Sequence, residues 1–189
     1  MASILKVDTI QDQSGNNIIN ENADTITIGA SGDTITIPSG ATIDLSNATQ
    51  TGVGKILQVV NGTTNVFANS TTNALVDTGL TATITPTSAS NKILVLAQQN
   101  GLAKVGNNFM ELILLRGATQ IATFGNALAY TATAADNRIG GAGLCYLDNP
   151  ITTSATTYKT QFKSASNGAD VTVQDNSALS TIILMEIQA

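Results

Sequence analysis

The chain has 189 residues and a formal net charge of −5; 42% of its residues are hydrophobic and only 11% are charged. It has no histidine and one cysteine, which excludes histidine-based catalysis, histidine metal sites and an intrachain disulfide. The eight basic residues are scattered along the chain, so we do not expect nucleic acid to be a partner.

Residues 1–22 contain two aliphatic segments separated by turn-forming residues. Ile4, Leu5, Val7 and Ile10 precede a stretch rich in Asp, Ser, Gly and Asn, and Ile18 and Ile19 follow it. This pattern predicts a strand, a tight turn and a second short strand. The piece is too small to be a domain, so its aliphatic side chains need sister chains or a docking partner to cover them.

Residues 23–54 contain a short repeat. The sequence DTITI at 24–28 returns at 33–37, and a looser copy, ATIDL, follows at 41–45. Each copy predicts a five-residue strand that buries only two aliphatic side chains, which is too little for an independent core. We therefore predict a shaft in which several identical chains share one apolar axis, lined by Ile26, Ile28, Ile35, Ile37, Ile43 and Leu45. A flexible linker or an edge hairpin is the alternative interpretation.

Residues 55–189 contain longer strand patterns. We expect strands at 56–60, 80–85, 92–98, 109–115, 120–124, 138–147, 155–164, 169–174 and 179–188, with no long helix. Asn61-Gly62 indicates a turn after the first strand, and Gly140, Gly141 and Gly143 indicate a bulge. The spacing predicts an all-β fold whose C-terminal head is an antiparallel β-sandwich of the jelly-roll type.

Several predicted head strands, 180–187 above all, are apolar on both faces. In a two-layer sandwich the outer face of a strand is normally polar, so these strands indicate contact with another subunit. Cys145 lies in such a strand and is expected to be a buried structural thiol. The residues expected in the head core or at a subunit interface are Leu94, Leu96, Ile113, Leu115, Tyr146, Phe162, Ile183 and Met185.

The segments SILKVDTIQDQSGNNIINENADTITIG and GDTITIPSGATIDLSNATQTG resemble the N-terminal part of tail-fibre and other appendage proteins of marine tailed phages. The last strand, STIILMEI, resembles that of their globular tips, and the head strands resemble trimeric jelly rolls of the tumour-necrosis-factor and complement-head type. The resemblance implies a homotrimer in the virion, with residues 1–22 anchoring it to other virion proteins, residues 23–54 forming the shaft and residues 55–189 the outermost head.

The sequence predicts no enzyme, cofactor or metal site. Asp136, Asp148, Glu111, Asp170 and Asp175 could in principle pair for glycoside hydrolysis, but none lies in a motif. For Glu111 and Glu186, which fall within apolar strands, we expect an arginine partner, Arg116 or Arg138, or a place at a subunit axis or rim. No apolar run is long enough to span a membrane, and the N-terminus lacks a signal-peptide core, so assembly in the host cytoplasm is expected.

Two functions of different classes remain open. The head could bind the host surface, a glycan or an outer-membrane protein, through distal loops at 61–72, 130–137 and 164–170. Alternatively, the protein could be a purely structural capsid or tail decoration or joining appendage.

Overall fold

The computed structural model describes residues 9–11, 13, 17–22, 25–28, 32, 34–42, 55–132, 134–165 and 168–189. The chain divides into two compact units, Met1–Thr51 and Gly52–Ala189, which we call the N-terminal unit and the head. Each is described by itself below. No helix in the described ranges is long and apolar enough to cross a bilayer.

The N-terminal unit contains a small antiparallel sheet of three strands in the order β1-β2-β3, with β1 at Thr9–Gln11, β2 at Asn17–Asn22 and β3 at Thr25–Ile28. The first DTITI copy is thus a strand, but it pairs with β2 of its own chain. The second copy is not a strand, since residues 34–38 have no ladder partner here. The predicted positions Ile43 and Leu45, and the side chain of Ile26, lie outside the described residues.

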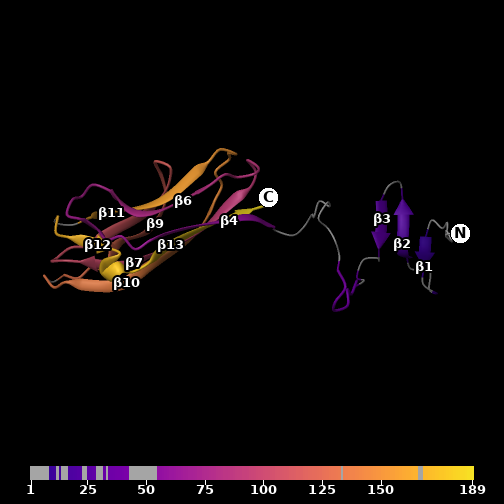
Figure 1. Cartoon of the computed structure of the whole chain (residues 1–189), viewed down its shortest axis with the longest axis horizontal. Coiled ribbons are helices and arrows are strands. Elements are labelled where there is room, and N and C mark those ends of the chain that lie inside the picture. The colour runs from indigo at the N-terminus through magenta and orange to yellow at the C-terminus, as the bar shows by residue number, and fades with distance from the viewer. Residues whose placement is uncertain are drawn as a thin grey trace. The chain divides into compact units, whose positions relative to one another are not determined.

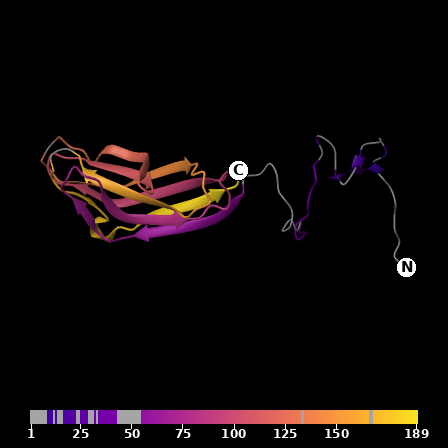
Figure 2. The same ribbon diagram turned by 90° about the horizontal axis from the view of Figure 1, so that it is seen from above.

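In its described residues the head is all-β apart from one short 3-10 helix. One sheet has the strand order β4-β13-β7-β12-β5, with β10 also paired to β7, and the other has the order β6-β11-β8-β9. Figure 1 shows the two sheets as separate layers, and Figure 2 shows their strands running along the length of the head. The strands are β4 (Ile56–Thr64), β5 (Ala68–Ser70), β6 (Val76–Ile84), β7 (Lys92–Lys104), β8 (Met110–Arg116), β9 (Thr119–Leu128), β10 (Asn137–Asp148), β11 (Thr156–Ser164), β12 (Val171–Val173) and β13 (Ser180–Ile187), and the helix η1 is Asp175–Ser177.

The two sheets are antiparallel and pack face to face, which confirms the predicted all-β sandwich. Period-two alternation explains the core: every second residue of β6 and of β11 is buried, while the residues between them are more exposed. The core contains two clusters. The larger is centred on Leu80, Ile84, Ile93, Val95, Leu114, Tyr158, Ile182 and Leu184, and the smaller on Leu102, Met110, Leu112, Phe162, Val171 and Val173.

The turn predicted at Asn61-Gly62 is wrong. Strand β4 continues through both residues to Thr64, with Asn61 opposite Ile183 and Gly62 opposite Ile182 of β13. Glycine is needed here because a Cβ on Gly62 would lie 2.0 Å from the carbonyl oxygen of Thr81 in the facing sheet. The predicted loop at 61–72 is therefore wrong as well, because β4 and β5 occupy most of it.

The bulge predicted in the glycine-rich strand is confirmed: the register between β10 and β7 shifts on both sides of Gly140. Gly140 has a φ of +75°, a left-handed conformation that glycine adopts without steric cost.

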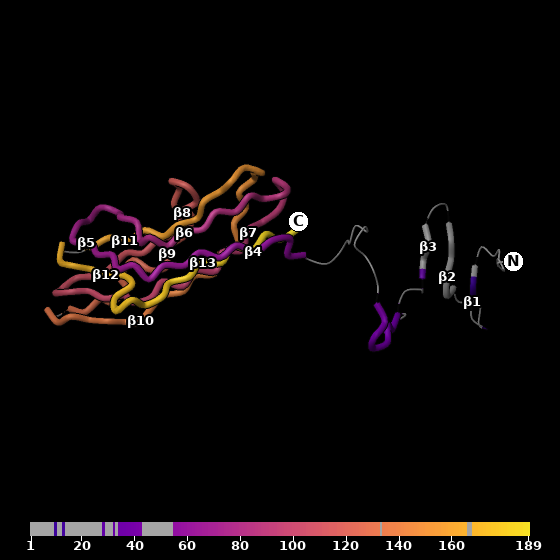
Figure 3. The backbone as a smooth tube through the Cα atoms, viewed as in Figure 1, coloured from indigo at the N-terminus to yellow at the C-terminus, as the bar shows by residue number. Residues whose placement is uncertain are grey.

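The two ends of the head differ. The backbone N–H of Gln188 donates to the carbonyl of Lys55 over 2.9 Å, so these two residues meet at one end of the head, which we call the proximal end. At the opposite, distal end lie Lys104, Asn137 and Val171, brought together by the register of β10 and β12 with β7. Figure 3 shows β5 and β12 side by side there, away from the C-terminus.

Candidate functional site

The outward-facing surface of the sheet containing β4, β13, β7 and β10 is apolar in its proximal half. The register places Val59, Met185, Leu94 and Leu147 in one row across the four strands, and Asn61, Ile183, Leu96 and Cys145 in the next. Val59 is 57% exposed and Leu147 is 52% exposed, so this chain alone does not cover them. We call this surface the apolar face, made of Ile56, Val59, Leu94, Leu96, Cys145, Leu147, Ile183, Met185 and Ile187.

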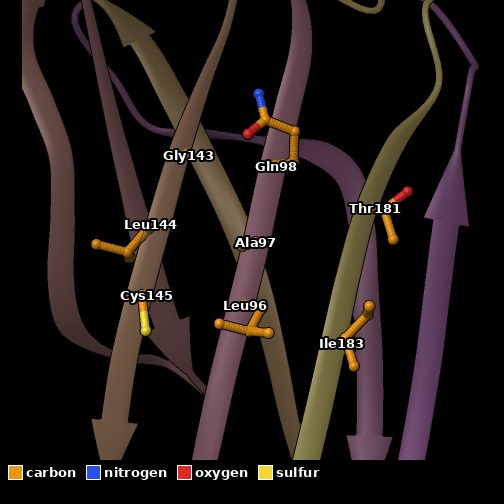
Figure 4. Close-up of a pocket in the computed structure, with 8 residues that line it drawn as sticks. All are labelled: Leu96, Ala97, Gln98, Gly143, Leu144, Cys145, Thr181 and Ile183. Atoms are coloured by element: carbon orange, nitrogen blue, oxygen red, sulfur yellow. The ribbon is translucent and has the colours of Figure 1, made fainter.

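A trough of about 480 Å³ lies at the distal edge of the apolar face. Figure 4 shows Cys145, Leu96 and Ile183 on neighbouring strands at one level of this trough, with Gln98 and Thr181 at the next. Toward the distal end the rows become polar, because Thr63, Thr181, Gln98 and Gly143 share one level. The apolar face therefore ends halfway along the sheet.

The expectation that Cys145 is buried is wrong. Its thiol lies on the exposed side of β10, whereas Leu144 and Tyr146 on either side pack against the core. Sequence alone gave no way to choose, because apolar residues occupy both faces of this strand.

The eight predicted core or interface residues fall into two groups. Ile113, Leu115 and Phe162 are buried within the head. Leu94, Leu96, Tyr146, Ile183 and Met185 are half-buried, and all of these except Tyr146 lie on the apolar face. Sequence reasoning missed Val59 and Leu147, which belong to the apolar face; no local signal identified them, because apolar residues occupy both faces of their strands.

Of the predicted shaft-axis residues whose side chains the structure describes, all are exposed: Ile28 by 56%, Ile35 by 57% and Ile37 by 42%. They belong to the N-terminal unit, so the exposure of aliphatic side chains is not confined to the head.

Glu186 is buried, and neutral donors surround it. Its carboxylate accepts hydrogen bonds from Asn91 Nδ2 at 2.6 Å, from Gln58 Nε2 at 2.6 Å and from the backbone N–H and hydroxyl of Thr87 at 2.7 and 2.8 Å. Burial alone would raise the pKa of Glu186, but the hydrogen bonds from Asn91, Gln58 and Thr87 outweigh it and lower the pKa to about 2. The expected arginine partner is therefore wrong for Glu186, whose carboxylate is satisfied by neutral donors, and its place at a subunit axis or rim stays a prediction.

The other candidate carboxylates separate as well. Glu111 pairs with Lys163 at 3.0 Å, in place of the expected arginine. Both carboxylate oxygens of Asp148 accept a hydrogen bond from Arg116 Nη1, each at 2.9 Å. Asp170 accepts a hydrogen bond from Asn69 at 3.1 Å, and Asp136 and Asp175 line a common pocket at the distal end.

Of the predicted distal loops, two remain irregular: Tyr130 to Asp136, with residue 133 outside the described residues, and Ala165 to Asp170, with 166 and 167 outside them. Tyr130 is 52% exposed and makes an edge-on contact with Phe109, with ring centroids 5.9 Å apart. The neighbouring η1 begins after Gln174, and Gln174, Asn176 and Ser177 all have φ between +54° and +58°. Non-glycine residues in this left-handed region are strained and cluster at functional sites.

Comparison with models of known protein families gives no match, and no curated protein matches the chain. Within the described ranges, no group of three or more carboxylate, cysteine or histidine side chains could hold a metal ion. The candidate functional features are therefore the apolar face and the distal end of the head.

Proposed function

We propose that this chain is a phage virion fibre protein: a homotrimer held in the virion by its N-terminus, whose C-terminal head binds the surface of the host cell. The observation that carries the proposal is the apolar face. Nine uncharged side chains from four strands share this surface, with Asn61 among them and Lys92 beside Ile187 at its proximal rim, and exposed patches of this kind mark protein interfaces. In this proposal, the apolar face of each chain is covered by the apolar faces of two further copies of the chain.

The N-terminal unit supports a second copy as the occupant over an unrelated partner. Ile28, Ile35 and Ile37 are exposed in a unit separate from the head. Parallel copies of one chain would cover both sets of side chains at once, whereas an unrelated partner would need two distinct binding surfaces. The trimeric shaft along these isoleucines and the jelly-roll assembly of the tumour-necrosis-factor type are parts of the same proposal.

Host binding follows from the arrangement of the head. If the shaft holds the proximal end, the distal end is the part that reaches the cell surface first. It carries irregular segments, an exposed aromatic ring and strained backbone, which are typical of binding sites. Three copies would add avidity to a weak contact with a glycan or an outer-membrane protein.

The oligomeric state is tested with Ile183→Asp, which places a charge in the centre of the apolar face. Light scattering should give a mass of about three chains for the unaltered protein and one for the variant. Thr83→Asp is the matched control, because Thr83 is exposed on the other sheet. A folded monomer of the unaltered protein at micromolar concentration would refute the trimer.

Host binding is tested by incubating labelled protein with host cells and with a resistant strain, and by locating residue 1 on the intact particle. Binding to host cells alone supports the proposal. Equally negligible binding to both strains, together with attachment to the capsid, would instead support the structural decoration protein.

A further inference from the structure

A second pocket, of about 220 Å³, lies at the distal end of the head, beyond the polar rows that end the apolar face. Its floor is a row of three outward-facing residues, because Ala103 of β7 pairs with Thr172 of β12 on one side and with Arg138 of β10 on the other. Asp175 of η1, Asp136 of the 130–136 segment and Phe67 between β4 and β5 complete the walls. Residues distant in sequence thus converge on one small cavity.

Thr172 gives the pocket an unsatisfied polar group. Val171 and Val173 point into the core, so the side chain of Thr172 points to the opposite face and into the pocket lining. Thr172 is only 9% exposed, and among the described residues its Oγ1 is the buried side-chain oxygen or nitrogen with no hydrogen-bond partner. Buried hydroxyls are nearly always bonded, so an exception calls for a group that the chain itself does not supply.

The charged walls of the pocket are held in place by contacts within the chain. Arg138 and Asp175 form an ion pair with each other. Asp175 packs closely against β7, since a Cβ added to Gly101 would lie only 2.3 Å from the backbone nitrogen of Asp175. The backbone N–H of the preceding residue, Gln174, also donates to the carbonyl of Asn100 over 2.9 Å. On the other side, Lys104 Nζ donates to the carbonyl of Ala135 at 2.5 Å, next to Asp136. A ligand would therefore meet walls that are already formed.

We propose that this pocket binds a neutral sugar ring, a terminal hexose of a surface glycan; this rests on the proposed host-binding function and names its ligand class. Phe67 is 53% exposed and offers a flat apolar surface to one face of the ring. The Asp136 carboxylate accepts from ring hydroxyls, the Arg138 guanidinium donates to them, and the Thr172 hydroxyl gains its missing partner. The volume admits a single ring-sized ligand.

A neutral sugar fits the charges better than an acidic one. Asp136 and Asp175 contribute two carboxylates to the lining, and no cation there is left to balance an anionic ligand. Asp175 neutralises the charge of Arg138, whose guanidinium has further N–H donors for a hydroxyl, and Lys104 donates to backbone carbonyls. The whole chain carries a formal net charge of −5, which disfavours the approach of an anionic ligand.

The test uses the whole chain and a panel of methyl glycosides of glucose, galactose, mannose and N-acetylglucosamine, with glucuronic acid as the acidic probe. Binding is followed by ligand-observed NMR and by titration calorimetry. We expect at least one neutral glycoside to bind, and Asp136→Asn and Phe67→Ala each to weaken it at least about tenfold, the loss of one good contact. Both positions are exposed, so these variants should fold. Ile151→Ala and Asp77→Asn, an exposed apolar residue and an acid that do not line the pocket, should bind as the unaltered chain does.

The inference is overturned if no glycoside binds, if only glucuronic acid binds, or if the pocket variants bind as well as the controls. These results are separable from the test of host binding. Host-cell binding that survives Asp136→Asn and Phe67→Ala would leave the fibre proposal standing and refute the pocket. Glycoside binding that these two variants abolish, without host-cell binding, would support the pocket and refute the host-binding function.

Discussion

The hydroxyl of Tyr158 donates a hydrogen bond to Asp148 Oδ2 over 2.6 Å and so connects the two sheets of the head, β11 in one and the end of β10 in the other. Arg116 holds the same carboxylate from β8. Burial is the main cause that raises the pKa of Tyr158, and its hydrogen bond to Asp148 adds to the effect, so the phenol stays protonated as a donor.

Tyr158→Phe should lower the free energy of unfolding by roughly 1.5–3 kcal/mol, the usual contribution of a hydrogen bond to a charged group. Urea denaturation measures the change. Tyr130→Phe is the matched control, since Tyr130 is 52% exposed and its hydroxyl should contribute less than about 0.5 kcal/mol. Equal stability of the two variants would show that the Tyr158–Asp148 bond does not stabilise the head.

Acid should destabilise the head through Glu186. Its pKa is lowered from 4.5 to about 2 in the folded chain, so its stabilising effect is complete above pH 4.5 and is lost as the pH falls toward 2. The loss should amount to roughly 2–3 kcal/mol. Thermal unfolding between pH 6 and pH 2 measures it. In Glu186→Gln this part of the pH dependence should disappear, whereas Glu111→Gln, which removes a partly exposed ion pair, should retain it.

Gly62→Ala should destabilise the head by about 3 kcal/mol or more, because the added methyl group would meet the backbone carbonyl of Thr81 at 2.0 Å and the two sheets would have to separate. Gly143→Ala is the control. Its Cβ would lie 2.8 Å from Oε1 of Gln98, the mobile end of a side chain, so a rotamer change relieves the contact. If both variants have the same melting temperature, the sheets are not as closely packed at Gly62 as described.

Cys145 reports on what covers the apolar face. Its thiol is exposed on the single chain, so in the proposed trimer it should react slowly with a maleimide or with Ellman's reagent. Ile183→Asp should accelerate the reaction, and Thr83→Asp should not. Rapid labelling of the unaltered protein under conditions in which light scattering reports a trimer would place the interface elsewhere.

Much of the fold could be predicted from alternation of apolar and polar residues. The strand predicted at 155–164 is confirmed as β11, and Phe162, predicted in the core, lies on its buried side. Lys159, Gln161 and Lys163 alternate with that side, so the period of two was visible in the sequence. Strand β7 was predicted too short, since Gln98-Gln99-Asn100-Gly101 resembles a loop. Gln99 is nevertheless fully buried, because its amide bonds to Ser180 at 3.1 Å and Thr160 at 3.0 Å, and these partners are far away in sequence.

The candidate sites were less accessible to sequence reasoning. The apolar face can be recognised only when the register of the strands is known. The register places Val59 and Leu147 at the two ends of one row although 88 positions separate them (147 − 59). The distal pocket depends on register and on a single unsatisfied hydroxyl at Thr172. Neither signal exists in the composition or spacing of any one segment, so carboxylates such as Asp136 and Asp175 could be named as candidates but not brought together.

The contact between Lys55 and Gln188 at the proximal end has a practical consequence for protein engineering. Because Lys55 and Gln188 are neighbours, residues 55–188 could be inserted into a surface loop of a carrier protein with short connecting peptides, without stretching either structure. Its distal end would point away from the carrier. Such a chimera would display a chosen number of heads on a carrier of known symmetry. Binding to cells could then be measured as a function of that number.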